Sequence, residues 1–465
     1  MPNFYKERYV SLFRYERRRD IQFFIRGILA IIFVLVVCGV LAFALSSIAW
    51  ALLEHWRIFV VPQSESFETS KNPILPLANL HHHAPKPSNR SISCKKRVVG
   101  FYTESETLEI SKIQIGKLTH AVFSHVEINW DGTLKFKNEK SKKRFLVLRN
   151  LTMMEAKFDV KLMISIGGYD NSQFFGSLTS SEKKMEKFTT SILSFLQEYD
   201  IDGVDISWHH ASESEKGNII ELVQTLRSKF QNLENQDFEI SLTLPAAGIE
   251  GWENAYDLQN LQDCVDFFNI YSMDYFNIYS MDYNGPWANQ WGTPAGPIAP
   301  LYNGIGLRKN FNVDWTMKYY VCQVKDPSKF NIVIPFMVRI WNHVQDPVEP
   351  SFSKAIRNVE LINNQAQGIA VLPRIHAKKW NLTNSTFDEK LKSSYIIDEK
   401  SKDYITFESS KSLAEKVKYV NSQNLGGVWI WAVDMDDEDY STLKSLTSEE
   451  LCSKSTNEKT LKYKC

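Results

Sequence analysis

The sequence predicts an α/β protein, a (β/α)8 TIM barrel with a small α+β insertion, preceded by an N-terminal transmembrane helix. From Arg97 onward, short β-branched or aromatic runs alternate with polar segments of helical composition. Eight such rounds imply a parallel sheet that closes on itself. The connection between the seventh and eighth runs is much longer than one helix needs, which predicts the insertion. An uncharged run from Gly27 to Leu53 predicts the membrane span.

The N-terminal region predicts a single-pass type II membrane glycoprotein. Residues 1–26 form a basic tail, and at ~1.5 Å per residue the run 27–53 reaches ~40 Å, more than the ~30 Å hydrocarbon core requires. Cleavable signals usually have an apolar region of only about 7–15 residues, so the run is interpreted as a signal-anchor. The positive-inside rule then places the tail in the cytosol and the large domain in the lumen or outside the cell. A cleaved signal is the alternative.

Residues 54–96 predict a flexible linker, because Ser, Pro, Asn and His replace bulky residues there. The run His81–His83 is interpreted as solvated, and no metal or other cofactor is predicted. Four Asn-x-Ser/Thr sequons, predicted to be glycosylated, lie at Asn89, Asn150, Asn381 and Asn384.

Charge and cysteine usage narrow the possible partners. Lys+Arg 54 balance Asp+Glu 54, so no nucleic-acid partner is expected. Cys38 lies in the predicted span, and five cysteines lie beyond it: Cys94, Cys264, Cys322, Cys452 and Cys465. An odd number in an oxidising compartment leaves at least one free or intermolecular thiol. Cys452 could pair with Cys465, and the remaining pairing stays open.

The predicted barrel covers 97–447, and 448–465 form a C-terminal tail. Its strands are Arg97–Tyr102, His120–His125, Val160–Ile166, Gly203–Ser207, Phe238–Leu244, a sixth ending near Met281, Ile332–Met337 and Gly427–Trp431. The insertion covers approximately 341–424 and contains the strand-like run Tyr404–Phe407.

The sixth strand contains a direct repeat, because Phe268–Tyr275 recurs unchanged as Phe276–Tyr283. A strand through both copies would run ~53 Å, at ~3.3 Å per residue, far longer than its neighbours. One copy must therefore leave the barrel. Which copy does so stays open, with the second slightly favoured as the strand because it continues into the Gly-Pro-Trp loop.

The stretch Asp202–His209 is the centre of the predicted site. Apolar residues alternate there with small or polar ones, as in a short parallel strand whose Asp205, Ser207 and His209 share one face. In α/β barrels the chemistry lies at the carboxyl ends of the strands.

This stretch resembles the signature Asp-x-x-Asp-x-Asp-x-Glu of the family 18 glycoside hydrolases, the chitinases and their lectin-like relatives. Asp202 and Asp205 match the first two acidic positions, whereas Ser207 and His209 occupy the last two. In that family the Glu protonates the leaving oxygen, and the preceding Asp supports attack by the substrate's N-acetyl group. The resemblance therefore implies a pseudoenzyme with no intact catalytic pair.

Three further segments extend the resemblance across 97–447. Ser165–Gly168 resembles the Ser-x-Gly-Gly strand, Lys329–Trp341 the seventh strand with Arg339 kept, and Leu425–Asp437 the eighth. The resemblance also implies that the inserted subdomain walls one side of a cleft. The ligand-binding candidates are Trp431, Asp282, Trp287, Arg339 and Tyr102, since aromatic faces hold sugar rings and a few polar groups orient them.

Some of these positions are also compatible with purely structural roles. Tyr102 could belong to barrel packing, and Asp205 could be a buried, hydrogen-bonded carboxylate. Asp434, Asp436 and Asp437 resemble a metal cluster, but a solvated or helix-capping role is preferred.

The favoured function is a catalytically inactive, membrane-anchored lectin for chitin or N-acetylglucosamine oligomers. Trp431 and Asp282 favour it. An interaction scaffold without sugar binding is the alternative, favoured by Met281 and Met337 where the family has tyrosines. A residual hydrolase that uses His209 as its acid is a second alternative. Protein partners are not identified by the sequence.

Overall fold

The computed structural model describes residues 96–104, 107–154, 159–233, 237–248, 251–271 and 283–448, together with Leu451, Tyr463 and Cys465. All belong to the second of two compact units, Pro87–Cys465. The predicted basic tail, the membrane span and the linker up to residue 95 lie outside the described residues, as do His81–His83, Asn89, Asp282 and Cys452. Among the residues that are described, no helix is both long and apolar enough to cross a bilayer.

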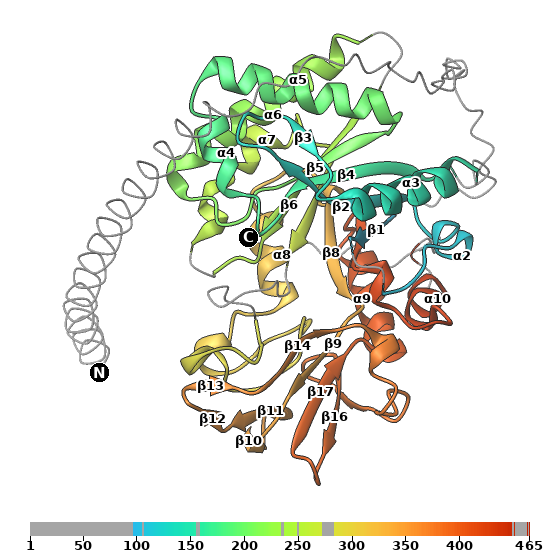
Figure 1. The fold of residues 1–465 in the computed structure, drawn as a ribbon. Coiled ribbons are helices and arrows are strands. Elements are labelled where there is room, and N and C mark those ends of the chain that lie inside the picture. Colours follow the sequence, from blue (N-terminus) through green and yellow to red (C-terminus); the bar gives the residue numbers. More distant parts are fainter. Residues whose placement is uncertain are drawn as a thin grey trace, which may run out of the picture. The chain divides into compact units, whose positions relative to one another are not determined.

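Eight parallel strands form a closed barrel (Figure 1). They are β1 (Arg97–Thr103), β2 (His120–Ile128), β4 (Lys161–Gly167), β5 (Gly203–Ser207), β6 (Glu239–Pro245), β7 (Phe267–Tyr271), β8 (Phe330–Pro335) and β18 (Gly427–Trp431). The ring closes because β1 pairs with both β2 and β18. The short β3 (Leu134–Lys135) pairs antiparallel with β2 as a hairpin. The predicted (β/α)8 barrel is confirmed.

Helices follow the strands and cover the barrel. They are α2 (Lys112–Ile115), α3 (Glu139–Met154), α4 (Gln173–Leu178), α5 (Glu182–Tyr199), α6 (Lys216–Gln231), α7 (Leu258–Leu261), α8 (Val313–Val321), α9 (Ser410–Ser422) and α10 (Ser441–Ser448). In α5, Met185, Phe188, Ile192 and Phe195 recur at helical spacing and are buried. This apolar face packs on the barrel, and Asp200 ends the helix in a left-handed conformation.

The first copy of the repeat supplies the barrel strand. Phe268, Asn269 and Ile270 pair with β6 on one side and β8 on the other. Helix α7 ends at Leu261, so only five residues (262–266) precede β7, and the nearer copy enters the sheet. Tyr283, which ends the second copy, is buried and donates to the Asn312 carbonyl at 3.0 Å. The preference for the second copy as the strand is wrong.

The insertion between β8 and β18 consists of antiparallel strands. They are β9 (Val338–Trp341), β10 (Val344–Glu349), β11 (Ser353–Val359), β12 (Leu361–Ile362), β13 (Gln365–Ala366), β14 (Gly368–Leu372), β15 (Thr386–Asp388), β16 (Ser393–Asp398) and β17 (Asp403–Phe407). Five of them form the sheet β14-β9-β17-β16-β15, drawn in shades of orange in the lower part of Figure 1. Between β9 and β17 the structure has strands and one 3-10 turn, η7 (Arg374–His376), where an α+β arrangement was expected.

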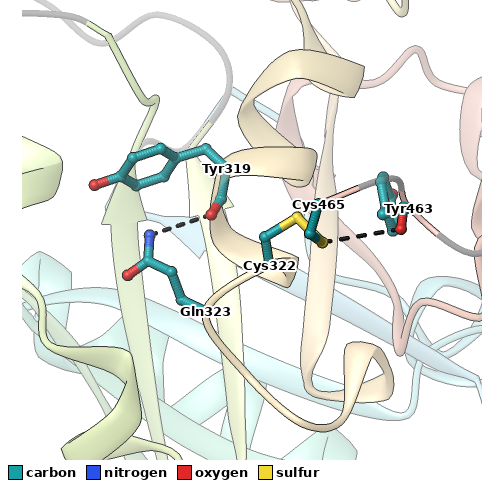
Figure 2. The surroundings of a disulfide bond; sticks show 5 residues. All are labelled: Tyr319, Cys322, Gln323, Tyr463 and Cys465. Atoms are coloured by element: carbon teal, nitrogen blue, oxygen red, sulfur yellow. Dashed lines mark hydrogen bonds between the residues drawn. A yellow bond between two sulfur atoms is a disulfide. The ribbon is translucent and has the colours of Figure 1, made fainter.

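A disulfide joins Cys322 at the end of α8 to Cys465, with a Cα–Cα distance of 5.6 Å (Figure 2). Nearby, the Tyr463 hydroxyl lies 2.8 Å from that of Tyr419 on α9, and Tyr419 donates to Asp314 on α8 at 3.0 Å. These contacts hold the last residues against the barrel helices. The pairing of Cys452 with Cys465 suggested by their proximity in sequence is therefore wrong, and Cys264 is a free thiol.

Candidate functional site

Asp205 lies at the centre of the barrel interior and is completely buried. Its carboxylate accepts hydrogen bonds from Ser165 (2.8 Å) on β4, from Ser241 (2.7 Å) and Thr243 (3.0 and 3.1 Å) on β6, and from Asn269 (3.3 Å) on β7. Burial raises the pKa of Asp205 to about 6, although these donors favour the anion. Asp205 therefore links β5 to β4, β6 and β7 beneath the mouth of the barrel.

Ser207 and His209 continue the inward row of β5 toward its carboxyl end. Ser207 is buried, and its Oγ lies 3.1 Å from Nε2 of the half-buried His209. Asp202, at the other end of the strand, is exposed and accepts from the Leu162 backbone N–H at 2.7 Å. The structure thus brings Asp205, Ser207 and His209 together and places Asp202 at the entrance of the strand.

The imidazoles at this end of the barrel are uncharged at neutral pH. Burial, followed by the nearby His125 and His210, lowers the pKa of His209 to about 3. Burial and then Lys137 lower the pKa of His125 to about 4. A neutral His209 has no imidazolium proton to donate, which argues against the hypothesis that it replaces the family's acid.

An aromatic cluster surrounds Trp431 above the Asp205 network. The ring centre of Trp431 lies 5.9 Å from that of Phe101, 6.0 Å from His125 and 6.3 Å from Tyr271. Tyr271 also lies 5.7 Å from the ring of His209, which links the cluster to β5. Trp431 is 3% exposed, so a sugar can reach its face only if a neighbouring side chain moves.

The loop after β4 holds His209 in place. Ser172 Oγ accepts from the His209 backbone N–H at 2.8 Å and donates to the Gly168 carbonyl at 2.6 Å. Gly168 has φ +75, and a Cβ there would lie 2.7 Å from the His125 ring. The Ser-x-Gly-Gly segment is therefore shaped so that His125 can approach the site.

Tyr102 does not belong to this cluster. Phe101 contacts Trp431, so by alternation the next residue of β1 points outward. Tyr102 is completely buried, and burial and then Asp434 raise its pKa. Its predicted ligand-binding role is corrected to packing between the barrel and its helices, and Phe101 takes the inward position.

Trp287 and Arg339 lie together where the insertion joins the barrel. The guanidinium of Arg339 lies 5.5 Å from the ring centre of the partly buried Trp287. Arg339 is completely buried and donates to the carbonyls of Asn284 (2.6 Å) and Ala370 (2.7 Å). Arg339 therefore supports the loop beneath Trp287 and presents no exposed surface to a ligand.

The acidic residues after β18 have structural roles. Asp434 pairs with Arg144 at 3.0 Å and accepts from the Thr103 hydroxyl at 2.6 Å. Asp436 accepts the Thr442 and Leu443 backbone N–H groups in the first turn of α10, and Asp437 accepts that of Ser441. The helix-capping interpretation is confirmed for Asp436 and Asp437. Within the described ranges, no group of three or more His, Cys, Asp or Glu residues is placed to hold a metal ion.

Several residues of the site were not singled out from the sequence, among them Phe101, His125, Tyr271, Ser172 and Arg308. His125 ends the predicted second strand, but it follows the parity of Phe123, which packs on Phe145 of α3, and the register of β2 shifts only after Ser124. Tyr271 lies in the copy of the repeat that was not favoured as the strand. Arg308 is buried and donates to Asn284 Oδ1 and to the carbonyls of Pro294, Trp291 and Thr293 at 2.7–3.1 Å. These hydrogen bonds hold the loop that carries Trp287 in its conformation, and no sequence pattern predicts that role.

The closed parallel barrel, with its polar and aromatic groups at the carboxyl ends of the strands, defines the class of α/β-barrel proteins whose site lies at that face. Residues 97–436 match the family Glycosyl hydrolases family 18, so the chain belongs to that family.

Its relatives include enzymes and chitinase-like proteins. The chain is 25% identical to human Chitinase-3-like protein 2 over 315 residues, 64% of this chain and 75% of the relative. It is 24% identical to Endochitinase 1 of Metarhizium robertsii over 319 residues, which cover 67% of this chain and 70% of the relative. Among solved structures, YKL-39 in the presence of chitooligosaccharides has a TM-score of 0.63 at 19% identity, covering 77% of this chain and 100% of that one. Class V chitinase from Nicotiana tobaccum has a TM-score of 0.63 at 15% identity, and the match covers 76% of this chain and 98% of that one. These structural likenesses show the fold.

Proposed function

We propose that this protein is a family 18 member that binds chitin or N-acetylglucosamine oligomers without hydrolysing them. The observation that carries the proposal is the Ser207–His209 pair at the mouth of the barrel, 3.1 Å apart. These residues stand where the family signature has a carboxylate and an acid. A serine hydroxyl provides no anion beside a developing cation, and a neutral imidazole provides no proton.

The remaining surface suits a neutral sugar. His125 and His209 are uncharged at pH 7 because burial lowers their pKa values. Phe101, Tyr271 and Trp431 form an aromatic cluster, and Tyr271 also contacts His209, whose ring lies 3.1 Å from the Ser207 hydroxyl. Aromatic surface with a few placed polar groups is typical of sugar sites. The relative YKL-39, whose structure was solved with chitooligosaccharides, supports this ligand class.

An interaction scaffold without sugar binding is a second candidate. The 3% exposure of Trp431 favours it, because a sugar ring needs an open aromatic face. The burial of Arg339 removes a second predicted ligand contact.

We further propose that the domain lies outside the cytosol, anchored by the predicted span 27–53 as a single-pass type II protein. The Cys322–Cys465 disulfide supports this placement, because disulfides persist in oxidising compartments. Asn150, Asn381 and Asn384 are exposed, as glycan acceptors must be. Protease added to intact cells should remove the domain and spare the N-terminal tail, whereas a soluble protein that begins near residue 60 would show cleavage.

Calorimetric titration of the full chain with the N-acetylglucosamine tetramer tests the binding proposal. The lectin proposal predicts saturable binding at or below millimolar ligand. No heat at that concentration, with the protein shown to be folded by its thermal transition, would favour the scaffold.

A further inference from the structure

A chain of hydrogen bonds runs through the barrel from Arg97 on β1 to Asp205. Arg97 Nε donates to Asn331 Oδ1 at 3.1 Å, and Asn331 Nδ2 donates to Asn269 Oδ1 at 3.0 Å. Asn269 Nδ2 in turn donates to Asp205 Oδ1 at 3.3 Å. Each bond is donated in the same direction, from the amino-terminal end of the barrel toward the site.

The chemistry of the two ends fixes this direction. A guanidinium has only donors, and an ionised carboxylate has only acceptors. The two asparagine amides between them can satisfy both ends in only one orientation. Asp205, Asn269 and Asn331 are all 0% exposed, so neither amide can turn toward bulk water instead. Arg97 is itself held, since it donates to the Ser328 carbonyl and lies 5.0 Å above the Phe267 ring.

We propose that Arg97 is a positioning residue for the site at the opposite end of the barrel and acts through Asn331 and Asn269 to hold Asp205 as a carboxylate. As a carboxylate, Asp205 accepts from the hydroxyls of Ser165, Ser241 and Thr243 together. A protonated Asp205 would have to donate one bond, which would turn one of these hydroxyls away beneath Ser207. The inference does not depend on whether the site binds a sugar.

Other ionisable groups lie on the elements that pack around β5. They are His120 on β2, Lys161 on β4, His209 on β5, Glu239 on β6, Tyr271 on β7 and Tyr256, which follows β6. Glu239 bonds both His120 and Lys161, and the opposite charges of Glu239 and Lys161 offset one another. Tyr256 donates to the Trp208 carbonyl at 2.6 Å. Arg97 is the charged group that a continuous series of hydrogen bonds joins to Asp205.

The test measures the pH at which Asp205 protonates in the full chain. The free energy of unfolding is measured from pH 4 to pH 8 for the wild type and for Asp205→Asn. The pH at which the slope of their difference against pH reaches half its full value, called the midpoint here, reports the pKa of Asp205 in the folded state. Arg97→Gln should raise this midpoint by about one pH unit, because it removes the charge at the head of the chain. For every variant, the reference is the same variant with Asp205→Asn added.

Lys161→Gln is the matched control, because it removes a positive charge at the same end of the barrel without breaking the chain. It should leave the midpoint unchanged within the error of the measurement. Asn331→Leu, which interrupts the chain and keeps Arg97, should raise the midpoint as Arg97→Gln does. An unchanged midpoint in Arg97→Gln, or an equal shift in Lys161→Gln, would overturn the proposal. If Asn331→Leu does not fold, the comparison of Arg97→Gln with Lys161→Gln decides alone.

Discussion

Ser207 Oγ and His209 Nε2 lie 3.1 Å apart at the carboxyl end of β5. The two side chains are therefore hydrogen-bonded to each other at the positions where the family signature has two carboxyl groups. Neither is charged at neutral pH, because burial lowers the pKa of His209 to about 3. These two positions therefore carry no charge at neutral pH, whereas Asp205 two residues earlier is an acidic residue.

Trp431→Ala should weaken binding of the N-acetylglucosamine tetramer about thirtyfold. Loss of a stacking aromatic face costs on the order of 2 kcal/mol. The measurement is calorimetric titration at pH 7, with Trp380→Ala as the control, because Trp380 lies in the insertion beside Lys379. Equal affinity of Trp431→Ala and the wild type would exclude Trp431 as the binding platform, provided both proteins melt cooperatively.

Glu239→Gln should destabilise the protein at pH 7 and lose this effect in strong acid. Burial alone would raise the pKa of Glu239, but His120 and Lys161 outweigh it and lower the pKa from 4.5 to about 2. A depressed carboxyl pKa contributes stability above pH 4.5 and loses it as the pH falls toward 2. Chemical denaturation between pH 2 and pH 7 checks this, with the exposed Glu221→Gln on α6 as the control. A wild-type advantage over Glu239→Gln that does not change with pH would contradict the assignment.

Arg308→Lys should loosen the loop that carries Trp287 even though the charge is kept. An ammonium cannot reproduce the fork that reaches Asn284, Pro294 and Trp291 at once. Hydrogen exchange should show faster amide exchange across 284–308 and unchanged protection in β1 and β18. Uniform protection across the loop would show that the loop folds without Arg308.

Cys465→Ser should lower the melting temperature of the full chain. The disulfide closes a sequence separation of 143 residues, for which loop-closure entropy predicts about 5 kcal/mol. A reducing agent should lower the wild-type value similarly and leave the variant unaffected. Peptide mapping that finds Cys465 joined to Cys452 would contradict the observed pairing.

The strands were predictable because their chemistry is local. The bounds of β5 and β18 agree with those predicted, since a glycine begins each run and apolar residues alternate with small, polar or aromatic ones. Alternation gives the period of a strand but not which set of side chains faces inward. For β1 the inward set is fixed by contacts such as Phe101 with Trp431, so Tyr102 could not be placed beforehand.

Long-range partnerships account for what the sequence did not reveal. Cys322 and Cys465 meet only because α8 and the C-terminal residues share one side of the barrel. The acceptors of Arg308 are carbonyls of turns, which carry no residue signature. The bonds from Arg97 to Asp205 join four strands, and the register that aligns them appears only in the closed barrel.

The most direct test incubates the full chain with the N-acetylglucosamine tetramer from pH 4 to pH 8 and counts both bound ligand and new reducing ends. Loss of general acid catalysis alone typically removes about 10²–10⁴ in rate, and loss of the supporting carboxylate removes a further large factor. The account predicts bound, intact tetramer at every pH, for the wild type and for His209→Ala. Wild-type cleavage that disappears in His209→Ala would contradict it and make His209 the acid of an active hydrolase.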